Sequence, residues 1–306
     1  MFKLDELSGV LVAMASPLKE DGSPDEAAIE RLVGHVLSGG VRGLLPLGST
    51  GEASSLDEPA RRKVLARVLE AAAQRVPVIC GVAQTSLSAA RAEVESAASL
   101  GADAVLVVPP FYYPANQTTL LEFYRRVAHA SPLPIFLYNI PQFTKVVAEP
   151  STVATLAREG TIAGMKDSSR DFEYFEGVLI ATRDLPKFRV FTGSDTTLLA
   201  SLVAGGAGTI CGAGNVAPHW VVQIYDDFQR GDIDAARVAQ DRLYKLVVAL
   251  RAGSFPGAIK AALHMQGICG PWPAPPVEKL DDRQTARLRE QLDGWGLLAP
   301  MGSRKI

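Results

Sequence analysis

The sequence lacks the features that mark a disulfide-rich, metal-binding or membrane-spanning protein. Its 306 residues include only three cysteines, Cys80, Cys211 and Cys269, which lie far apart and form no CxxC pair. An odd number of isolated cysteines gives no disulfide framework and no cysteine-based metal site, and it indicates a reducing compartment. The four histidines show no metal-ligand spacing, and no apolar run approaches the roughly 20 residues of a membrane span. We therefore expect a cytoplasmic protein with no bound metal and no membrane partner.

An excess of basic charge is also missing. The formal net charge is −2, whereas a protein that binds nucleic acid presents a strongly basic face. Residues 1–7 mix both charge signs and have no apolar core of the kind found in secretory signals. The hydrophobic content of 47% and the charged content of 21% are typical of a globular protein. We expect no nucleic-acid partner.

Eight short apolar runs, rich in Val, Ile and Leu, alternate with stretches of helical spacing. Such runs suit strands that are buried on both faces of a parallel sheet. Eight of these units predict an α/β protein with a (β/α)8 TIM barrel over residues 1–219, whereas a doubly wound open sheet would leave several units over. The expected strands are 9–15, 43–47, 76–82, 104–108, 134–138, 162–165, 189–191 and 208–211. The expected helices between them are 25–37, 57–72, 86–99, 118–130, 150–158, 171–181 and 196–204.

The strand pattern stops after residue 215. Helical spacing continues over 220–230, 233–251, 256–265 and 281–292. Residues 220–306 are therefore predicted to form a helical C-terminal extension packed on the barrel. Local signals support the helix boundaries: Ser86 is a suitable N-cap, and Gly101 suits a helix exit.

Lys166 stands directly after the sixth apolar run. In a (β/α)8 barrel, catalytic groups gather at the carboxyl ends of the strands. The other lysines of the first 220 residues fall in predicted loops or helices. A lysine amine that loses its proton in an apolar pocket is a nucleophile able to form a Schiff base with a carbonyl. The alternative interpretation is a surface lysine just past a strand, which is more common for this residue type.

Three further segments on the same predicted rim suit such chemistry. Residues 48–52, Gly-Ser-Thr-Gly-Glu, offer amides and hydroxyls that can bind a carboxylate, although a plain loop with a capping hydroxyl has the same composition. Tyr112 and Tyr138 can relay protons near an amine, or can serve as core aromatics.

Four motifs resemble those of one known family. They are Gly-Ser-Thr-Gly-Glu at 48–52, Pro-Pro-Phe-Tyr-Tyr at 109–113, Tyr-Asn-Ile-Pro at 138–141 and Gly-Met-Lys-Asp-Ser at 164–168. In order and separation they are similar to the dihydrodipicolinate synthase / N-acetylneuraminate lyase family of class I, pyruvate-dependent aldolases. The resemblance implies a Schiff base between Lys166 and pyruvate or another 2-oxo acid, with no metal or organic cofactor. It also implies a homotetramer or dimer.

The same resemblance implies roles for individual residues. Tyr138 would transfer protons, and Ser49 and Tyr112 would complete a hydroxyl relay, with Tyr112 coming from a neighbouring subunit. The catalytic set is then Lys166, Tyr138, Ser49 and Tyr112. Thr50 and its neighbours would hold the 2-oxo acid carboxylate, and the substrate-binding set is Gly48, Thr50, Phe143, Ser168, Asp195 and Ile210.

Departures from the family pattern bear on the substrate. Phe143 stands where dihydrodipicolinate synthases carry an arginine for the second substrate's carboxylate, and a phenyl ring cannot replace that bidentate donor. Arg170 and Lys145 are the basic residues that could substitute for it. N-Acetylneuraminate lyases bind the sugar part of their substrate with two adjacent acidic residues after the seventh strand and with a later serine. Here Asp195 is kept, but Thr196 and Gly212 replace the others.

The Lys-Asp-Ser-Ser sequence resembles 2-keto-3-deoxygluconate-type aldolases most. We predict a lyase that makes or cleaves a carbon–carbon bond between pyruvate and an aldehyde, with a 2-keto-3-deoxy sugar acid or a 4-hydroxy-2-oxo acid as the joined compound. The alternatives within the family are 4-hydroxy-tetrahydrodipicolinate synthase of lysine biosynthesis and N-acetylneuraminate lyase. Two alternatives lie outside the family. One is a catalytically inactive barrel that binds a 2-oxo acid as a sensor, and the other is a barrel enzyme that binds a phosphate-sugar.

Overall fold

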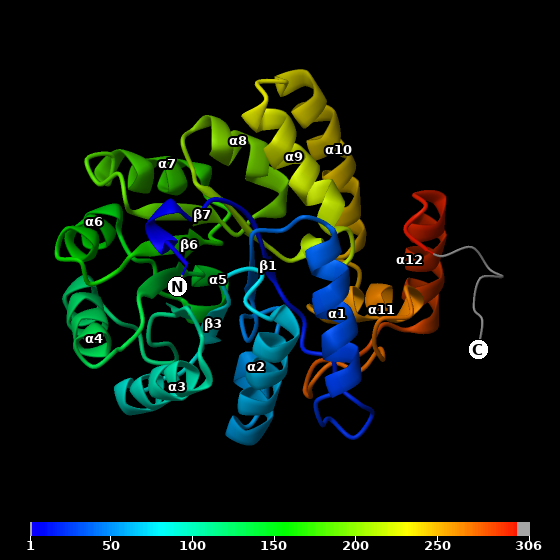
Figure 1. The fold of residues 1–306 in the computed structure, drawn as a ribbon, viewed down its shortest axis with the longest axis horizontal. Helices are drawn as coiled ribbons and strands as arrows, with labels where there is room; N and C mark the ends of the chain where they lie inside the picture. The colour runs from blue at the N-terminus through cyan, green and yellow to red at the C-terminus, as the bar shows by residue number, and fades with distance from the viewer. Residues whose placement is uncertain (1, 299–306) are drawn as a thin grey trace.

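Eight parallel strands form the centre of the computed structural model, which describes residues 2–298 (Figure 1). They are hydrogen-bonded in the order β2-β1-β8-β7-β6-β5-β4-β3, and a parallel bridge between Leu44 and Val78 joins the two ends. The sheet is therefore a (β/α)8 TIM barrel, and this prediction is confirmed. Its strands are β1 (Gly9–Ala13), β2 (Gly43–Leu45), β3 (Ile79–Val82), β4 (Ala104–Val107), β5 (Ile135–Asn139), β6 (Gly164–Asp167), β7 (Arg189–Thr192) and β8 (Gly208–Cys211).

Both faces of the sheet are buried, which explains why the strands are apolar throughout. In β1, Leu11 packs inside the barrel, whereas Val10 and Val12 pack against the outer helices. In β5, Phe136 and Tyr138 likewise belong to the interior cluster. Side chains alternate between the faces of a strand, so every position needs an apolar partner on one side or the other.

Helices follow the strands around the outside of the barrel. The first helix buries an apolar stripe that includes Ile29, Leu32 and Val36, and Ser86 accepts the Ala89 amide at 3.2 Å to cap the third. That helix ends at Gly101, whose φ of +94° is left-handed, as expected for a C-terminal glycine. Each of the seven helices expected between the strands is present, with observed bounds α1 (Glu26–Ser38), α2 (Glu58–Ala72), α3 (Leu87–Leu100), α4 (Gln117–His129), α6 (Pro150–Arg158), α7 (Phe172–Ala181) and α8 (Leu198–Val203). Short helical turns that were not predicted are α5 (Pro141–Thr144), Leu4–Glu6, Ala53–Ser55, Asp195–Thr197 and Ala213–Asn215.

Helix α9 (Pro218–Gln229) crosses the expected division between residues 219 and 220. It contacts β1, α1 and α8, which is the place of the eighth barrel helix. We therefore propose that the extension begins with α10 (Ile233–Ala249), which lies beside α9 (Figure 1). Helices α11 (Gly257–Met265) and α12 (Asp282–Gly294) follow and contact each other. None of the helices within residues 2–298 has the length and apolar character needed to cross a bilayer.

Candidate active site

Lys166 lies inside the mouth of the barrel, on β6. The strand continues to Asp167, so the lysine belongs to the strand rather than following it. Lys166 pairs with Tyr138 of β5, and residues that pair directly on neighbouring strands point to the same face. The Lys166 side chain is therefore directed inward with Tyr138, is only 4% exposed, and places its Nζ 4.5 Å from the centroid of the Tyr138 ring. The surface interpretation of this lysine is wrong.

Gly193, just after β7, makes room for the lysine. A Cβ built on Gly193 would lie 2.7 Å from the Cε of Lys166 and 2.0 Å from the Oγ of Ser168. Both separations are shorter than any ordinary contact, so a larger residue would displace the amine. Sequence reasoning assigned no function to this glycine, because a glycine that makes room for another side chain carries no chemical signal of its own.

The strands that carry Lys166 and Tyr138 are fixed to each other at their ends. Asn139 Nδ2 donates to Asp167 Oδ1 at 2.8 Å, and Ser169 Oγ donates to Asp167 Oδ2 at 2.9 Å. Burial raises the pKa of the Asp167 carboxyl, and these hydrogen bonds oppose that rise. The network lies beside Lys166 and Tyr138 and joins the ends of the two strands that carry them.

A hydroxyl contact links Tyr138 to the loop after β2. The Ser49 Oγ and the Tyr138 OH are 3.5 Å apart, at the long limit of a hydrogen bond. Both side chains border the same space as the amine of Lys166. The structure thus brings together three of the four residues expected to be catalytic.

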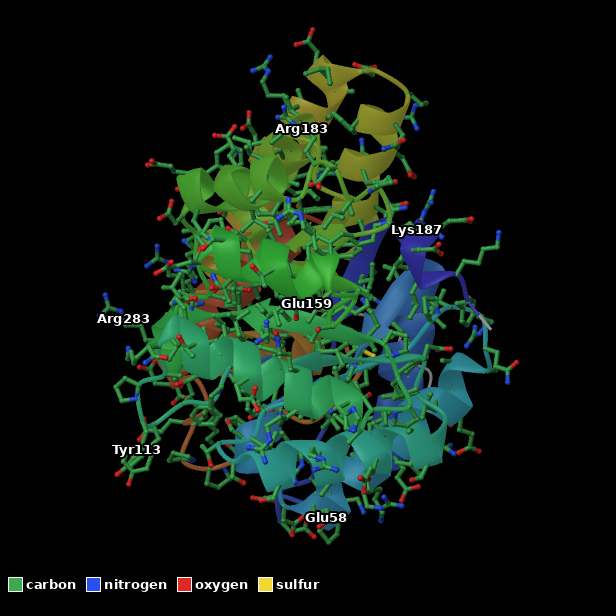
Figure 2. The ribbon with its side chains drawn as sticks, turned by 90° about the vertical axis from the view of Figure 1, so that its left-hand side faces the viewer. Glu58, Tyr113, Glu159, Arg183, Lys187 and Arg283 are labelled. Carbon is green, nitrogen blue, oxygen red and sulfur yellow. The ribbon has the colours of Figure 1, made fainter. Side chains whose placement is uncertain are left out.

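The fourth, Tyr112, lies elsewhere in this chain. Its side chain is 85% exposed, and its backbone φ of +82° is left-handed, which is unusual for a tyrosine. It packs edge-on against Tyr113, which projects from the edge of the molecule (Figure 2). Its assignment to the site of a neighbouring subunit stays a prediction.

The loop that carries Ser49 and Thr50 is flanked by residues with left-handed backbone conformations, and a hydrogen bond holds it in place. Leu47 and Glu52 on either side of it have φ values of +60° and +57°. Ser16 Oγ donates to the carbonyl of Gly51 at 2.6 Å, which holds the loop against the start of the chain. Within residues 2–298, the amides of Ser49 and Thr50 donate to no protein acceptor. Unpaired amides at a cavity wall are the donors that a bound carboxylate needs.

A buried ion pair fastens this loop to the C-terminal extension. Lys260 of α11 forms an ion pair with Glu52, and both side chains are at most 1% exposed. Lys260 Nζ also donates to the Trp272 carbonyl at 2.8 Å, and the Ala274 amide donates to Glu52 Oε1 at 2.6 Å. Burial raises the pKa of Glu52 and lowers that of Lys260, while their mutual attraction opposes both shifts.

The amine of Lys166 opens into a cavity of about 550 Å³. Expected site residues line it: Ser49, Thr50, Tyr138, Phe143, Lys166, Ser168, Asp195 and Ile210. Gly48 instead borders an adjoining cavity of about 250 Å³, which shares Ser49 and Phe143 with the first. Sequence reasoning missed the wall that the extension contributes, formed by Val247, Leu250, Arg251, Gly253, Phe255 and Ile259.

The rest of the cavity is polar on one side and apolar on another. Asp195 Oδ2 accepts from the Ala213 amide at 3.3 Å, whereas its Oδ1 is buried without a partner among the described residues. Burial raises the pKa of Asp195 to about 6, opposed by the Ala213 amide and the charge of Lys166. Phe143 is 56% exposed, and its ring packs 6.4 Å from that of Phe255.

Basic side chains reach the cavity from two loops. Arg170 lines it from the segment between β6 and α7, as the sequence allowed. Arg251 lines it from the segment just after α10. Lys145 does not line it, because its Nζ turns back to the Gln142 carbonyl at 2.9 Å. Within residues 2–298, no cluster of three or more His, Cys, Asp or Glu side chains is placed to hold a metal ion.

Comparison with known proteins gives consistent matches over nearly the whole chain. A family model described as "Dihydrodipicolinate synthetase family" matches residues 6–294. A DapA-like lyase of Halobacterium salinarum is 38% identical over 293 residues, covering 95% of each chain. A 4-hydroxy-tetrahydrodipicolinate synthase of Hyphomonas neptunium is 39% identical over 263 residues, covering 86% of this chain and 89% of the relative.

Solved structures agree with this result. Dihydrodipicolinate synthase from Thermotoga maritima superposes with a TM-score of 0.92 at 32% identity, covering 96% of this chain and 100% of that one. A prophage protein of the dihydrodipicolinic acid synthase family from E. coli K12, in complex with pyruvate, superposes with a TM-score of 0.91 at 28% identity. The latter alignment covers 95% of this chain and 99% of the other.

Proposed function

The chain belongs to the dihydrodipicolinate synthetase family, whose members are class I pyruvate-dependent lyases, and we propose that Lys166 forms an imine with pyruvate or a related 2-oxo acid. The observation that carries the proposal is the position of Lys166: buried at the barrel mouth, 4.5 Å from the ring of Tyr138, and open to the cavity. The unpaired amides of Ser49 and Thr50 would receive the 2-oxo acid carboxylate.

In the cleavage direction, the substrate is a 4-hydroxy-2-oxo acid bound as an iminium on Lys166. The C4 hydroxyl loses its proton, the C3–C4 bond breaks, and an aldehyde leaves. The bonding electrons move to the iminium nitrogen and form an enamine. The enamine takes a proton at C3, and water then hydrolyses the imine to release pyruvate and the free amine. We assign proton transfer to the phenol of Tyr138, which Ser49 Oγ contacts at 3.5 Å.

We further propose that the aldehyde carries hydroxyl groups, so that the joined compound is a 2-keto-3-deoxy sugar acid or a related 4-hydroxy-2-oxo acid. The unpaired Oδ1 of Asp195 is an acceptor that lacks a donor, and a substrate hydroxyl would supply one. The ring of Phe143 gives no hydrogen bond to a polar tail.

A second candidate is 4-hydroxy-tetrahydrodipicolinate synthase, because several relatives carry that name. In that reaction the partner of pyruvate is aspartate semialdehyde. Steady-state condensation of pyruvate with aspartate semialdehyde and with hydroxylated aldehydes separates the two candidates. Our assignment expects the hydroxyaldehydes to react faster, and faster reaction of aspartate semialdehyde restores the lysine-pathway candidate.

The Schiff base itself has a direct test. Borohydride in the presence of pyruvate should add one covalent adduct per chain, and peptide mapping should place it on Lys166. The variant Lys166→Arg keeps the positive charge but should form no adduct, because a guanidinium stays protonated. An adduct on another residue, or none in the wild type, refutes the proposed function.

We also propose that the enzyme works in the cytoplasm as a dimer or tetramer in which Tyr112 completes a neighbouring site. The exposed and left-handed Tyr112 supports a contact outside its own chain. Mixing inactive Lys166→Arg chains with Tyr112→Phe chains tests this, because some mixed pairs then contain one intact site. Unchanged activity in Tyr112→Phe alone would remove the tyrosine from the relay.

A further inference from the structure

The walls of the cavity are more positive than the proposed imine chemistry requires. Its charged lining residues are Lys166, Arg170 and Arg251, opposed by the single carboxylate of Asp195. Once the imine forms, the charge of the iminium is balanced by the carboxylate of the bound 2-oxo acid. Asp195 can balance one arginine, and the charge of Arg251 does act on it. Arg170 and Arg251 are both exposed residues at the edge of the cavity, and one of their positive charges then has no counterpart in the protein.

Both guanidinium groups are available to a ligand. Within residues 2–298, neither Arg170 nor Arg251 forms a salt bridge or donates a side-chain hydrogen bond to the protein. They come from separate segments, one after β6 and one after α10, and yet line the same cavity. Arg170 has a left-handed backbone, with φ of +65°. A planar guanidinium binds carboxylate or phosphate oxygens through paired hydrogen bonds.

We infer that Arg170 and Arg251 bind a second anionic group, a carboxylate or phosphate at the end of the substrate remote from the keto carbon. This rests on the proposed function, since the 2-oxo end must be held by Lys166. The substrate class is therefore a hydroxylated 2-oxo acid with an anionic tail, and the aldehyde released from it carries that tail. The arginine that Phe143 replaces is compensated from two other segments rather than lost.

The first measurement needs no knowledge of the natural aldehyde. Borohydride trapping on Lys166 is followed at increasing concentrations of paired 2-oxo acids that differ only in the tail. The pairs are 2-oxoglutarate against 2-oxohexanoate, and 2-oxoadipate against 2-oxoheptanoate. We expect an acidic tail to lower the half-saturating concentration by about tenfold or more, as one charge-assisted contact does.

Variants then assign that preference to the two arginines. Arg170→Gln and Arg251→Gln should each reduce it by about threefold to tenfold, and the double variant should abolish it. Lys145→Gln is the matched control, because it removes a nearby charge that does not line the cavity. Trapping with pyruvate should stay within about threefold of wild type in all of these variants, which also shows that each one is folded.

A second measurement distinguishes the two kinds of anion. Tartronate semialdehyde carries a carboxylate where glyceraldehyde carries a hydroxymethyl group, and glyceraldehyde 3-phosphate carries a phosphate. The kcat/KM for condensation with pyruvate should favour one of the charged aldehydes in wild type and lose that preference in the double variant. A larger preference for the phosphate ester identifies phosphate as the anion, and the reverse identifies carboxylate.

The outcomes distinguish the proposed function of Lys166 from the inference about Arg170 and Arg251. If pyruvate gives no adduct on Lys166, the proposed function fails. If pyruvate is trapped normally but acidic and neutral tails saturate alike, the inference about the arginines is wrong and the proposed function stands. A preference for acidic tails that persists in the double variant also overturns it.

Discussion

The variant Lys260→Met tests how the extension supports the active site. It would leave the Glu52 carboxylate buried without its cation, in a place where both side chains are at most 1% exposed. Removing one partner of a buried ion pair costs roughly 3–5 kcal/mol. The free energy of unfolding should therefore fall by about that amount at neutral pH. Methionine keeps most of the volume of the lysine stem, so little of the loss comes from a cavity.

The loss converts into a change in melting temperature. Unfolding entropy is about 2.1 cal/mol/K per residue, or roughly 0.6 kcal/mol/K for a chain of this length. The Tm of Lys260→Met should then be lower than that of wild type by about 5–8 °C in a calorimetric scan. The fall should come with slower turnover, because Glu52 ends the loop that carries Ser49 and Thr50.

The loss should also depend on pH. Without Lys260, burial raises the pKa of Glu52 further above its value in the unfolded chain. The folded variant then holds a proton that the unfolded chain releases, so its stability falls as pH rises above the unfolded pKa. The difference in Tm between wild type and variant should be smaller at pH 5 than at pH 8.

Two comparisons make the test decisive. Lys145→Met removes an exposed lysine and should leave the Tm nearly unchanged. The double variant Glu52→Gln/Lys260→Met leaves no buried charge and should recover part of the lost stability. A Tm for Lys260→Met within about 1 °C of wild type, or a double variant less stable than the single one, would refute the reasoning.

Three more predictions concern the site itself. Tyr138→Phe should keep the fold and the pyruvate adduct but lower kcat by roughly 10²–10⁴-fold, and wild-type turnover would show that the phenol is only structural. Gly193→Ala should slow adduct formation by roughly tenfold to a hundredfold, because its Cβ would displace Lys166, whereas Gly212→Ala should not, since its nearest contact is an ordinary 3.6 Å. The kcat/KM for a hydroxylated aldehyde should rise with pH through about 6 as Asp195 ionises, and Asp195→Asn should remove that inflection; an inflection that persists would assign it to another group.

The fold could be predicted because its signals are local. Each strand of the barrel is a short apolar run, since neighbours cover both of its faces, and helix ends such as Ser86 and Gly101 follow simple backbone rules. The end of the sixth strand was predicted at residue 165, two residues before its observed end at Asp167. The hydrogen bonds that extend β6 to Asp167 come from β5 and β7, which the residues of β6 alone do not reveal.

The candidate site was predictable only in part for a related reason. Lys166 and Tyr138 sit near the ends of neighbouring strands, and Ser49 lies in the loop after β2, so the barrel itself brings them together. Arg251 comes from a helical segment far along the chain, and no pattern within that segment shows that it returns to the cavity. Its signal was weak: a break in helical spacing near residues 251–256, where the chain leaves α10.

The extension returns to the barrel mouth and forms part of the cavity wall. Bond making and the selection of substrates can therefore depend on different parts of the chain. The residues that we propose to be catalytic, Lys166 and Tyr138, stand on the strands, whereas much of the remaining cavity wall belongs to α10 and the loop that follows it. Changes at positions such as Arg251 or Phe255 can therefore alter which compounds are accepted without moving the reactive amine. Divergence within this architecture, or its deliberate redesign, has a region open to variation that lies about 85 residues along the chain from Lys166, the proposed nucleophile.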